Sequence, residues 1–146
     1  MMQTFMRERY SLQHTKDWIF VENETSGTSV LYRNPLIDDN EELTYPSFVV
    51  TISTQIGTVN AIVNETKKDL RNILSSISFN KEQLSDDCVE LEYSGFHNNI
   101  NMKFAQKIII DRGKVYSITG GCIASRFNQI FCEVKGMMES FTLTSI

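Results

Sequence analysis

Side chains able to catalyse a reaction are few in this chain, and none stands in a recognised motif. Cys88, Cys122 and Cys132 show no C-x-x-C spacing, and the chain has only two histidines. A zinc site needs several thiol or imidazole ligands at set spacings, which this distribution does not provide. No G-x-S-x-G segment marks a nucleophilic serine. We therefore expect no metal, no cofactor and no catalytic residues.

A cysteine-dependent enzyme is kept as a third hypothesis. Cys132 and His97 could form a nucleophile and base, because such partners meet in space rather than in sequence. His97 lies in a polar segment, 94–101, where a solvated histidine is the ordinary case. Free thiols are usual in a reducing compartment, so we expect a cytoplasmic protein. An exported protein whose leader has been removed is the alternative.

Gly120, Gly121 and Arg126 form a candidate anion site. The segment 120–126 joins an expected strand to an expected helix, and the amide groups at a helix N-terminus can hold an anion. The segment matches neither of the common phosphate-binding glycine patterns. A plain strand-to-helix turn, in which glycine permits positive φ, is the alternative.

Leu36, Ile37 and Tyr45 are candidates to bind a protein partner. They lie in the longest irregular segment of the sequence, 34–46, and long loops in compact domains are often functional. Packing of these residues as a lid over a sheet edge is the alternative, because apolar loop residues usually bury. The acidic residues of this segment lack the glycine of a calcium-binding EF-hand loop, so we expect them to be solvated.

Length and charge limit the class of protein. At 146 residues the chain is expected to form a single domain, 1–146. The net charge of −4 argues against binding to nucleic acid, which requires a basic surface. No apolar run approaches the roughly 20 residues of a membrane span. The sequence therefore predicts a soluble protein.

Hydrophobic spacing predicts two long helices. Val59, Ile62 and Val63 begin an apolar stripe at helical spacing, which predicts a helix over 58–78 with Thr58 as its N-cap. A second stripe from Phe127 to Phe141 predicts another helix, capped by Ser125.

The segments between and before these helices predict strands. β-branched and alternating residues indicate strands at 10–12, 19–22, 29–33, 47–56, 88–93, 102–111 and 114–119. A polar connection is expected at 80–87, and 142–146 is expected to be a tail or a short last strand. Seven strands with two helices cannot form a doubly wound parallel sheet, because each parallel crossover needs its own long connection. The prediction is an α+β fold, an α/β/α sandwich with a largely antiparallel sheet of about six to seven strands.

Short patterns give the chain a resemblance to the PsbP-like fold superfamily, which includes PsbP, the Ran-binding Mog protein, DcrB-like proteins and Eag-type chaperones. The segment 10–18 resembles the family's entry strand and ends in Asp17-Trp18, with Thr15 where the family usually has proline. The segment 113–119 follows a G-x-x-Y-x-(I/L)-T pattern, and Ser140-Phe141 follows the terminal helix. The resemblance implies an α/β/α sandwich with helices on opposite faces, and it implies binding of other macromolecules.

These observations rank the functions. The leading prediction is a non-enzymatic protein-binding or assembly module, adaptor-like or chaperone-like, with a protein partner. A small-molecule or anion-binding domain that uses 120–126 is the alternative, and a cysteine-dependent enzyme comes third. A homodimer is a further expectation, through a sheet edge or the segment 36–45.

Overall fold

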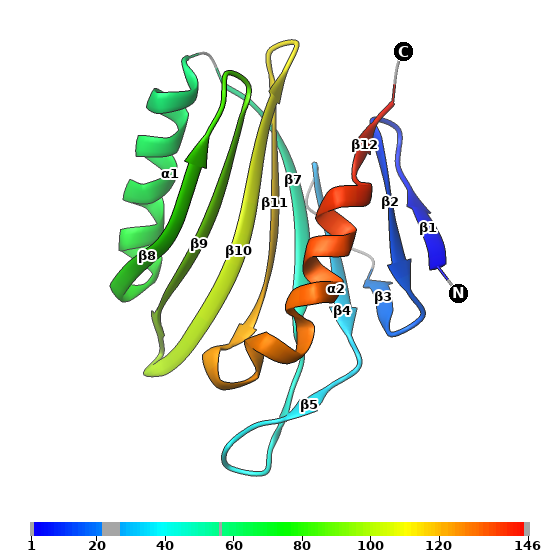
Figure 1. Cartoon of the computed structure of the whole chain (residues 1–146), viewed down its shortest axis with the longest axis vertical. Helices are drawn as coiled ribbons and strands as arrows, with labels where there is room; N and C mark the ends of the chain where they lie inside the picture. The colour runs from blue at the N-terminus through cyan, green and yellow to red at the C-terminus, as the bar shows by residue number, and fades with distance from the viewer. Residues whose placement is uncertain (1, 22–26, 56, 145–146) are drawn as a thin grey trace.

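A computed structural model describes residues 2–21, 27–55 and 57–144 of the chain. Its centre is a single large antiparallel sheet with one helix on each face (Figure 1). The predicted α+β architecture is therefore confirmed.

The main sheet has seven strands, and every neighbouring pair is antiparallel. In spatial order they are β3 (Trp18–Val21), β4 (Thr28–Arg33), β7 (Ser47–Thr54), β11 (Lys114–Ile123), β10 (Ile100–Asp111), β9 (Cys88–His97) and β8 (Ser75–Leu84). Residues 22 and 56, at the predicted ends of two strands, lie outside the described part of the chain.

Two smaller sheets accompany the main one. The first has three strands, β1 (Met2–Met6), β2 (Tyr10–Thr15) and β12 (Thr142–Leu143), so the short last strand expected near the C-terminus is present. The second is a two-stranded ribbon of β5 (Leu36–Ile37) and β6 (Leu43–Thr44), which extends beyond the end of the main sheet (Figure 1).

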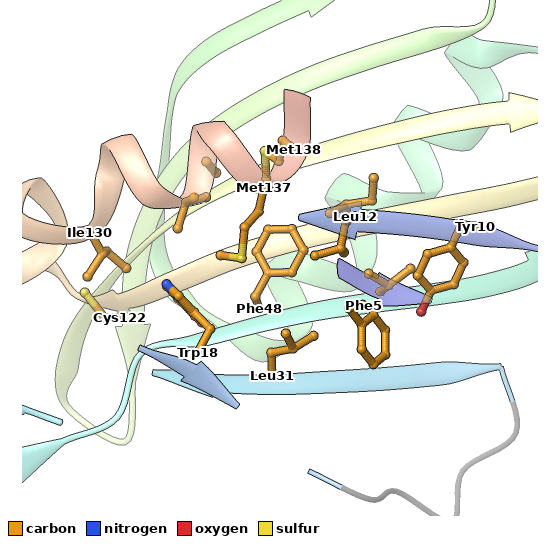
Figure 2. Close-up of a cluster of buried hydrophobic side chains, with 14 of the residues drawn as sticks. Phe5, Tyr10, Leu12, Trp18, Leu31, Phe48, Cys122, Ile130, Met137 and Met138 are labelled. Carbon is orange, nitrogen blue, oxygen red and sulfur yellow. The ribbon is translucent and has the colours of Figure 1, made fainter. Parts of the chain in front are cut away.

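Helix α2 (Phe127–Ser140) and the three-stranded sheet together cover one face of the main sheet. The core between these layers includes Trp18, Leu12 and Phe48, each with almost no exposed surface (Figure 2). Fully burying one such apolar side chain is worth about 1.5–3 kcal/mol, so this core carries much of the stability.

Helix α1 (Val59–Ile73) lies on the opposite face, over β8 and β9. Its buried residues Ile62 and Val63 belong to a second core with Leu91 and Ile108. Thr58 caps this helix as predicted, since its Oγ1 accepts a hydrogen bond from the Ala61 amide at 3.1 Å. The two helices occupy opposite faces, as the PsbP-like resemblance implies.

The predicted end of the first helix is wrong. The helix stops at Ile73, and Leu74 is already extended. Strand β8 follows from Ser75 to Leu84, so it replaces both the last predicted turn of the helix and most of the polar connection expected at 80–87. Ile77 lies three residues after Leu74, a helical spacing, but it also alternates with serines as strand residues do. In the structure Ile77 packs against the core beneath α1, but it does so as a residue of strand β8.

The predicted start of the second helix also differs. Strand β11 continues through Gly120 and Gly121 to Ile123, so these glycines do not form a turn. A short 3-10 helix, Ala124–Arg126, then leads into α2, and no side chain caps either helix. The expected Ser125 cap is therefore absent.

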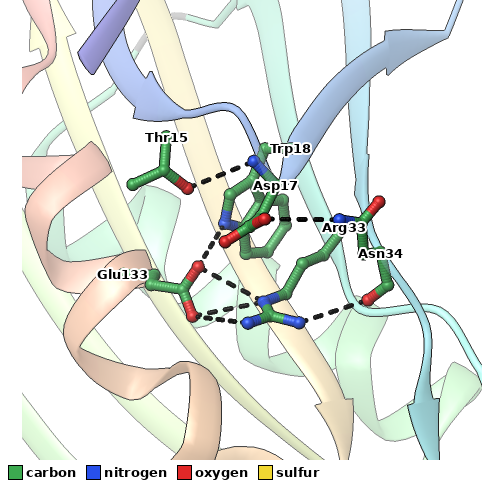
Figure 3. A network of polar contacts seen from close by, with 6 residues as sticks. All are labelled: Thr15, Asp17, Trp18, Arg33, Asn34 and Glu133. Carbon is green, nitrogen blue, oxygen red and sulfur yellow. Dashed lines mark hydrogen bonds and ion pairs between the residues drawn. The ribbon is translucent and has the colours of Figure 1, made fainter. Parts of the chain in front are cut away.

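A polar network fastens α2 to the edge of the main sheet (Figure 3). Trp18 Nε1 donates to Glu133 Oε1 at 3.1 Å, and Arg33 Nε donates to the same carboxylate at 3.2 Å. A second Arg33 nitrogen lies 3.1 Å from Glu133 Oε2, which makes the pair bidentate. Both charged side chains are largely buried, so the ion pair is less screened than a surface pair.

We expect Glu133→Ala to lower the free energy of unfolding by about 2 kcal/mol, because it leaves the Trp18 N–H and the Arg33 guanidinium without their shared acceptor. Glu133→Gln should cost less, since an amide oxygen can still accept from Trp18. Urea unfolding followed by the fluorescence of Trp18, the single tryptophan, measures both changes.

Glu139→Ala is the matched control, because Glu139 is exposed on the same helix. It should change stability by less than about 0.5 kcal/mol. Equal losses at positions 133 and 139 would contradict the anchoring role of the network.

Candidate binding surface

The two helices are offset along the sheet, so the described residues leave part of each face without a covering layer. On the side of α2, the bare part lies over β8 and β9 and carries charged residues. Lys81 lies 3.7 Å from Glu92, and Lys135 of α2 lies 3.4 Å from Glu90. Ion pairs of this kind are compatible with water, so these charged residues need no partner to cover them.

On the side of α1, the bare part lies over β3, β4 and β7 and is apolar. We define the open apolar face as Ile19, Val21, Val30, Tyr32 and Val49. Ile19 is 59% exposed, Val21 43% and Tyr32 42%, while Val30 and Val49 are half-buried.

Strand register brings these five residues together. Ile19 lies opposite Tyr32 on the neighbouring strand, and Val21, Val30 and Val49 form one row across three strands. Side chains directly opposite one another in a sheet are in contact range, so the five form a continuous patch.

Small polar residues border the open apolar face on the side of β11. Alternation along β7 and β11 places small polar residues beside it on the same face: Ser47, Thr51, Ser117 and Thr119. Charged side chains are depleted from the centres of protein interfaces, and the five residues of the open apolar face are likewise uncharged.

A run of apolar residues in strand β3 is a signal for this patch in the sequence. Strand β3 reads Trp-Ile-Phe-Val, four apolar residues in succession, although an antiparallel strand with one solvated face should alternate. Trp18 is buried in the core and Phe20 packs against it, whereas Ile19 and Val21 point to the opposite, bare face.

The three predicted partner-binding residues are split by the structure. Leu36 is partly buried against the main core, which is closer to the alternative of packing than to a free binding residue. Ile37 and Tyr45 are exposed. Tyr45 comes two residues before Ser47, at the end of the open apolar face nearer the β5–β6 ribbon.

The residues proposed for anion binding are engaged in packing and in other bonds. A Cβ on Gly120 would lie 2.6 Å from a methyl group of Val134, and one on Gly121 would overlap the Phe104 ring. Arg126 Nε donates to the Ile37 carbonyl at 2.7 Å, and the guanidinium pairs with Asp39 at 3.3 Å. Arg126 thus fastens the β5–β6 ribbon, and the predicted turn is missing.

The cysteines occupy three different environments. Burial raises the pKa of the Cys122 thiol to about 11, partly opposed by Arg33, and burial also raises the pKa of the half-buried Cys88. Cys132 is exposed on α2 and lines a cavity of about 250 Å³ together with the buried His14. His97, the histidine considered in the sequence, is exposed at the end of strand β9.

His14 is held by its own strand. Its Nδ1 lies 2.7 Å from the Thr15 carbonyl, which can only accept, so Nδ1 carries the proton. In the described part of the chain no hydrogen bond connects His14 with Cys132, and no group of three or more metal-ligating side chains occurs. Among the described residues, no helix is long and apolar enough to cross a membrane.

We expect iodoacetamide to label Cys132 much faster than Cys88 or Cys122, because the thiolate reacts and burial both shields the other two thiols and raises their pKa. Mass spectrometry of the labelled peptides measures the three rates. His14→Gln should leave the Cys132 rate within about twofold if His14 does not activate the thiol. A tenfold fall in that variant would instead favour the cysteine-dependent enzyme.

Comparison with known proteins identifies the fold. No model of a protein family and no curated protein matches the chain. Among solved structures, PA94 of Pseudomonas aeruginosa, a protein of unknown function, is 14% identical over 99% of each chain, with a TM-score of 0.67. LpqN of Mycobacterium tuberculosis, which is involved in cell envelope biogenesis, is 15% identical over 93% of this chain and 83% of its own, with a TM-score of 0.63.

A third similar structure carries the name of the superfamily. Cyanobacterial PsbP (CyanoP) from Synechocystis is 15% identical over 98% of this chain and 92% of its own, with a TM-score of 0.60. Likeness at this level of identity concerns the fold. The chain therefore has the PsbP-like fold that its sequence resembles.

Proposed function

We propose that this protein is a non-enzymatic binding or assembly module whose protein partner docks on the open apolar face. The observation that supports this most directly is the cluster of exposed Ile19, Val21 and Tyr32 on the open apolar face. Contiguous exposed apolar patches are uncommon on monomeric proteins and mark interaction sites.

The dimensions of the bare region favour an amphipathic helix as the element that docks. Strands β3, β4, β7 and β11 span three inter-strand spacings, roughly 14 Å. An α-helix with its side chains is about 10–12 Å wide, so one helix fits beside α1 on this face. The chain already covers the other half of this face with a helix of its own, which supports the same mode of packing for a partner.

A second copy of the chain is the alternative occupant. Two open apolar faces could pack against each other, as aligned sheets do in sandwiches, and the result would be a homodimer. Sedimentation velocity separates the two cases. If the wild-type chain is a dimer and Ile19→Lys makes it a monomer, the partner is a second copy of the chain. If the wild-type chain is a monomer, the partner is a different protein.

We expect Ile19→Lys to weaken partner binding at least tenfold, because a lysine in the centre of the apolar contact must be desolvated without a counter-charge. The partner is isolated by affinity capture from the native organism, and its dissociation constant is then measured with the purified proteins by calorimetry. Tyr32→Ser should weaken binding in the same direction, by the loss of aromatic contact area.

Ile73→Lys is the matched control. Ile73 is 59% exposed, as is Ile19, but it ends helix α1 and lies outside the open apolar face. This variant should bind as the wild type does, and both lysine variants should keep their stability within about 1 kcal/mol. Retention of binding by Ile19→Lys, or equal loss in both variants, would overturn the proposal.

We place this role in the cytoplasm, a proposal that rests on the three free thiols. Cell fractionation with an antibody to the chain tests it. Recovery of the protein only from the exported fraction would contradict it.

A further inference from the structure

A second cavity lies at the end of the interface between the two larger sheets, away from the open apolar face. It has a volume of about 540 Å³, which is in the range of small-molecule sites. Arg7 and Arg9 reach it from the β1–β2 connection, and Lys114 reaches it from the start of β11.

The cavity is locally basic in an acidic protein. It is lined by three cationic side chains and one carboxylate, Glu8, whereas the whole chain has a net charge of −4. Among residues 2–21, 27–55 and 57–144, no carboxylate forms an ion pair with Arg7, Arg9 or Lys114.

Aromatic packing positions one of the cations. The guanidinium carbon of Arg7 lies 4.2 Å from the centroid of the Phe20 ring and 4.9 Å from that of Phe5. A guanidinium stacked in this way keeps the donors at its rim free to bind, so Arg7 is held ready for an anion.

Tyr10 lines the same cavity and carries a buried hydroxyl without a partner. Tyr10 is only 2% exposed, and its hydroxyl makes no hydrogen bond to any described residue. The hydroxyl points past Phe5 toward the strand that carries Leu31 (Figure 2). An unsatisfied buried hydroxyl costs about 1–3 kcal/mol, so such a group calls for an explanation.

The neighbours of this hydroxyl fit a site for a negative charge. Burial raises the pKa of Tyr10, while the nearby Ser29 hydroxyl and the Arg7 guanidinium oppose the rise. Tyr10 therefore stays protonated at neutral pH and can donate a hydrogen bond. Ser29 lines the cavity beside Tyr10, and the Tyr10 hydroxyl, which has no hydrogen-bond partner among the described residues, can turn to a ligand.

We propose that this cavity binds a phosphate monoester. Two guanidinium groups and an ammonium group match the charge and the oxygens of a phosphate, and the Tyr10 hydroxyl supplies a buried donor. The volume exceeds that of phosphate alone, and Phe20 and Ile52 form an apolar wall for the organic part of the ligand. This site is separate from the proposed protein-binding face, so either proposal can fail alone.

The test is calorimetric titration of the full chain with inorganic phosphate and with glycerol 3-phosphate. We expect the phosphate monoester to bind with a dissociation constant below about 1 mM and more tightly than inorganic phosphate. Flotation with phosphatidylcholine vesicles, with and without phosphatidic acid, shows whether the phosphate comes from a lipid headgroup. Binding of glycerol 3-phosphate or of phosphatidic acid supports the site, and the absence of binding to both overturns it.

Tyr10→Phe tests the buried hydroxyl. It should weaken binding of the probe about tenfold while leaving the melting temperature of the free protein unchanged or higher, because it removes only an unsatisfied group. A fall in melting temperature with unchanged binding would assign the hydroxyl a purely structural role and would overturn its part in the site.

Lys114→Gln and Lys68→Gln form a matched pair for the charge. Lys114 lines the cavity, whereas Lys68 is exposed on α1, and both variants lose one positive charge. Lys114→Gln should weaken binding at least fivefold and Lys68→Gln should leave it unchanged. Equal effects of the two would reduce the binding to a general charge effect and would overturn the proposal.

Discussion

The area of a seven-stranded sheet is the constraint on which the rest of this structure depends. Six inter-strand spacings make the sheet roughly 29 Å wide, and each helix covers a width of about 10–12 Å. One helix per face therefore cannot bury the sheet. The small sheet of β1, β2 and β12 extends the cover on the side of α2, but no described element lies beside α1 over β3 and β4.

The two uncovered regions of the main sheet differ in the residues that they expose. Over β8 and β9 the chain places ion pairs, such as Lys81 with Glu92, which water can solvate. Over β3, β4 and β7 it places aliphatic and aromatic residues, such as Ile19 and Tyr32, which water solvates poorly. The difference cannot follow from the fold, because both regions are surfaces of the same sheet. The difference therefore supports the proposed docking role of the second region.

Close packing at the centre holds α2 against the main sheet. Gly120 lets Val134 of α2 approach β11 from one side, and Gly121 leaves room for Phe104 on the other. The Glu133 carboxylate then fixes α2 to β3 and β4 through Trp18 and Arg33. Strand β3 thus separates the two proposed sites. Phe20 points to one side of the sheet and lines the proposed phosphate-binding cavity, whereas Ile19 points to the other side and belongs to the open apolar face.

The sequence by itself determined the class of fold and most of the elements. Periodic apolar residues such as Ile62 and Val63 located the first helix, and Thr58 located its start, because caps and stripes are local properties of the chain. Local rules failed where two periods overlap, as at Ile77, and where a strand continues through glycines at 120 and 121.

The tertiary structure alone decided the sites. The open apolar face joins residues of β3, β4 and β7 through strand register, and nothing near Ile19 in the sequence indicates that Tyr32 or Val49 is its neighbour. The phosphate cavity likewise brings Arg7 and Tyr10 together with Lys114, which is more than a hundred residues away. The run of apolar residues in β3 signals that both faces of this strand are apolar. Which face a helix leaves uncovered, and which buried hydroxyl stays without a partner, depend on packing between distant segments, which a pattern within one strand does not describe.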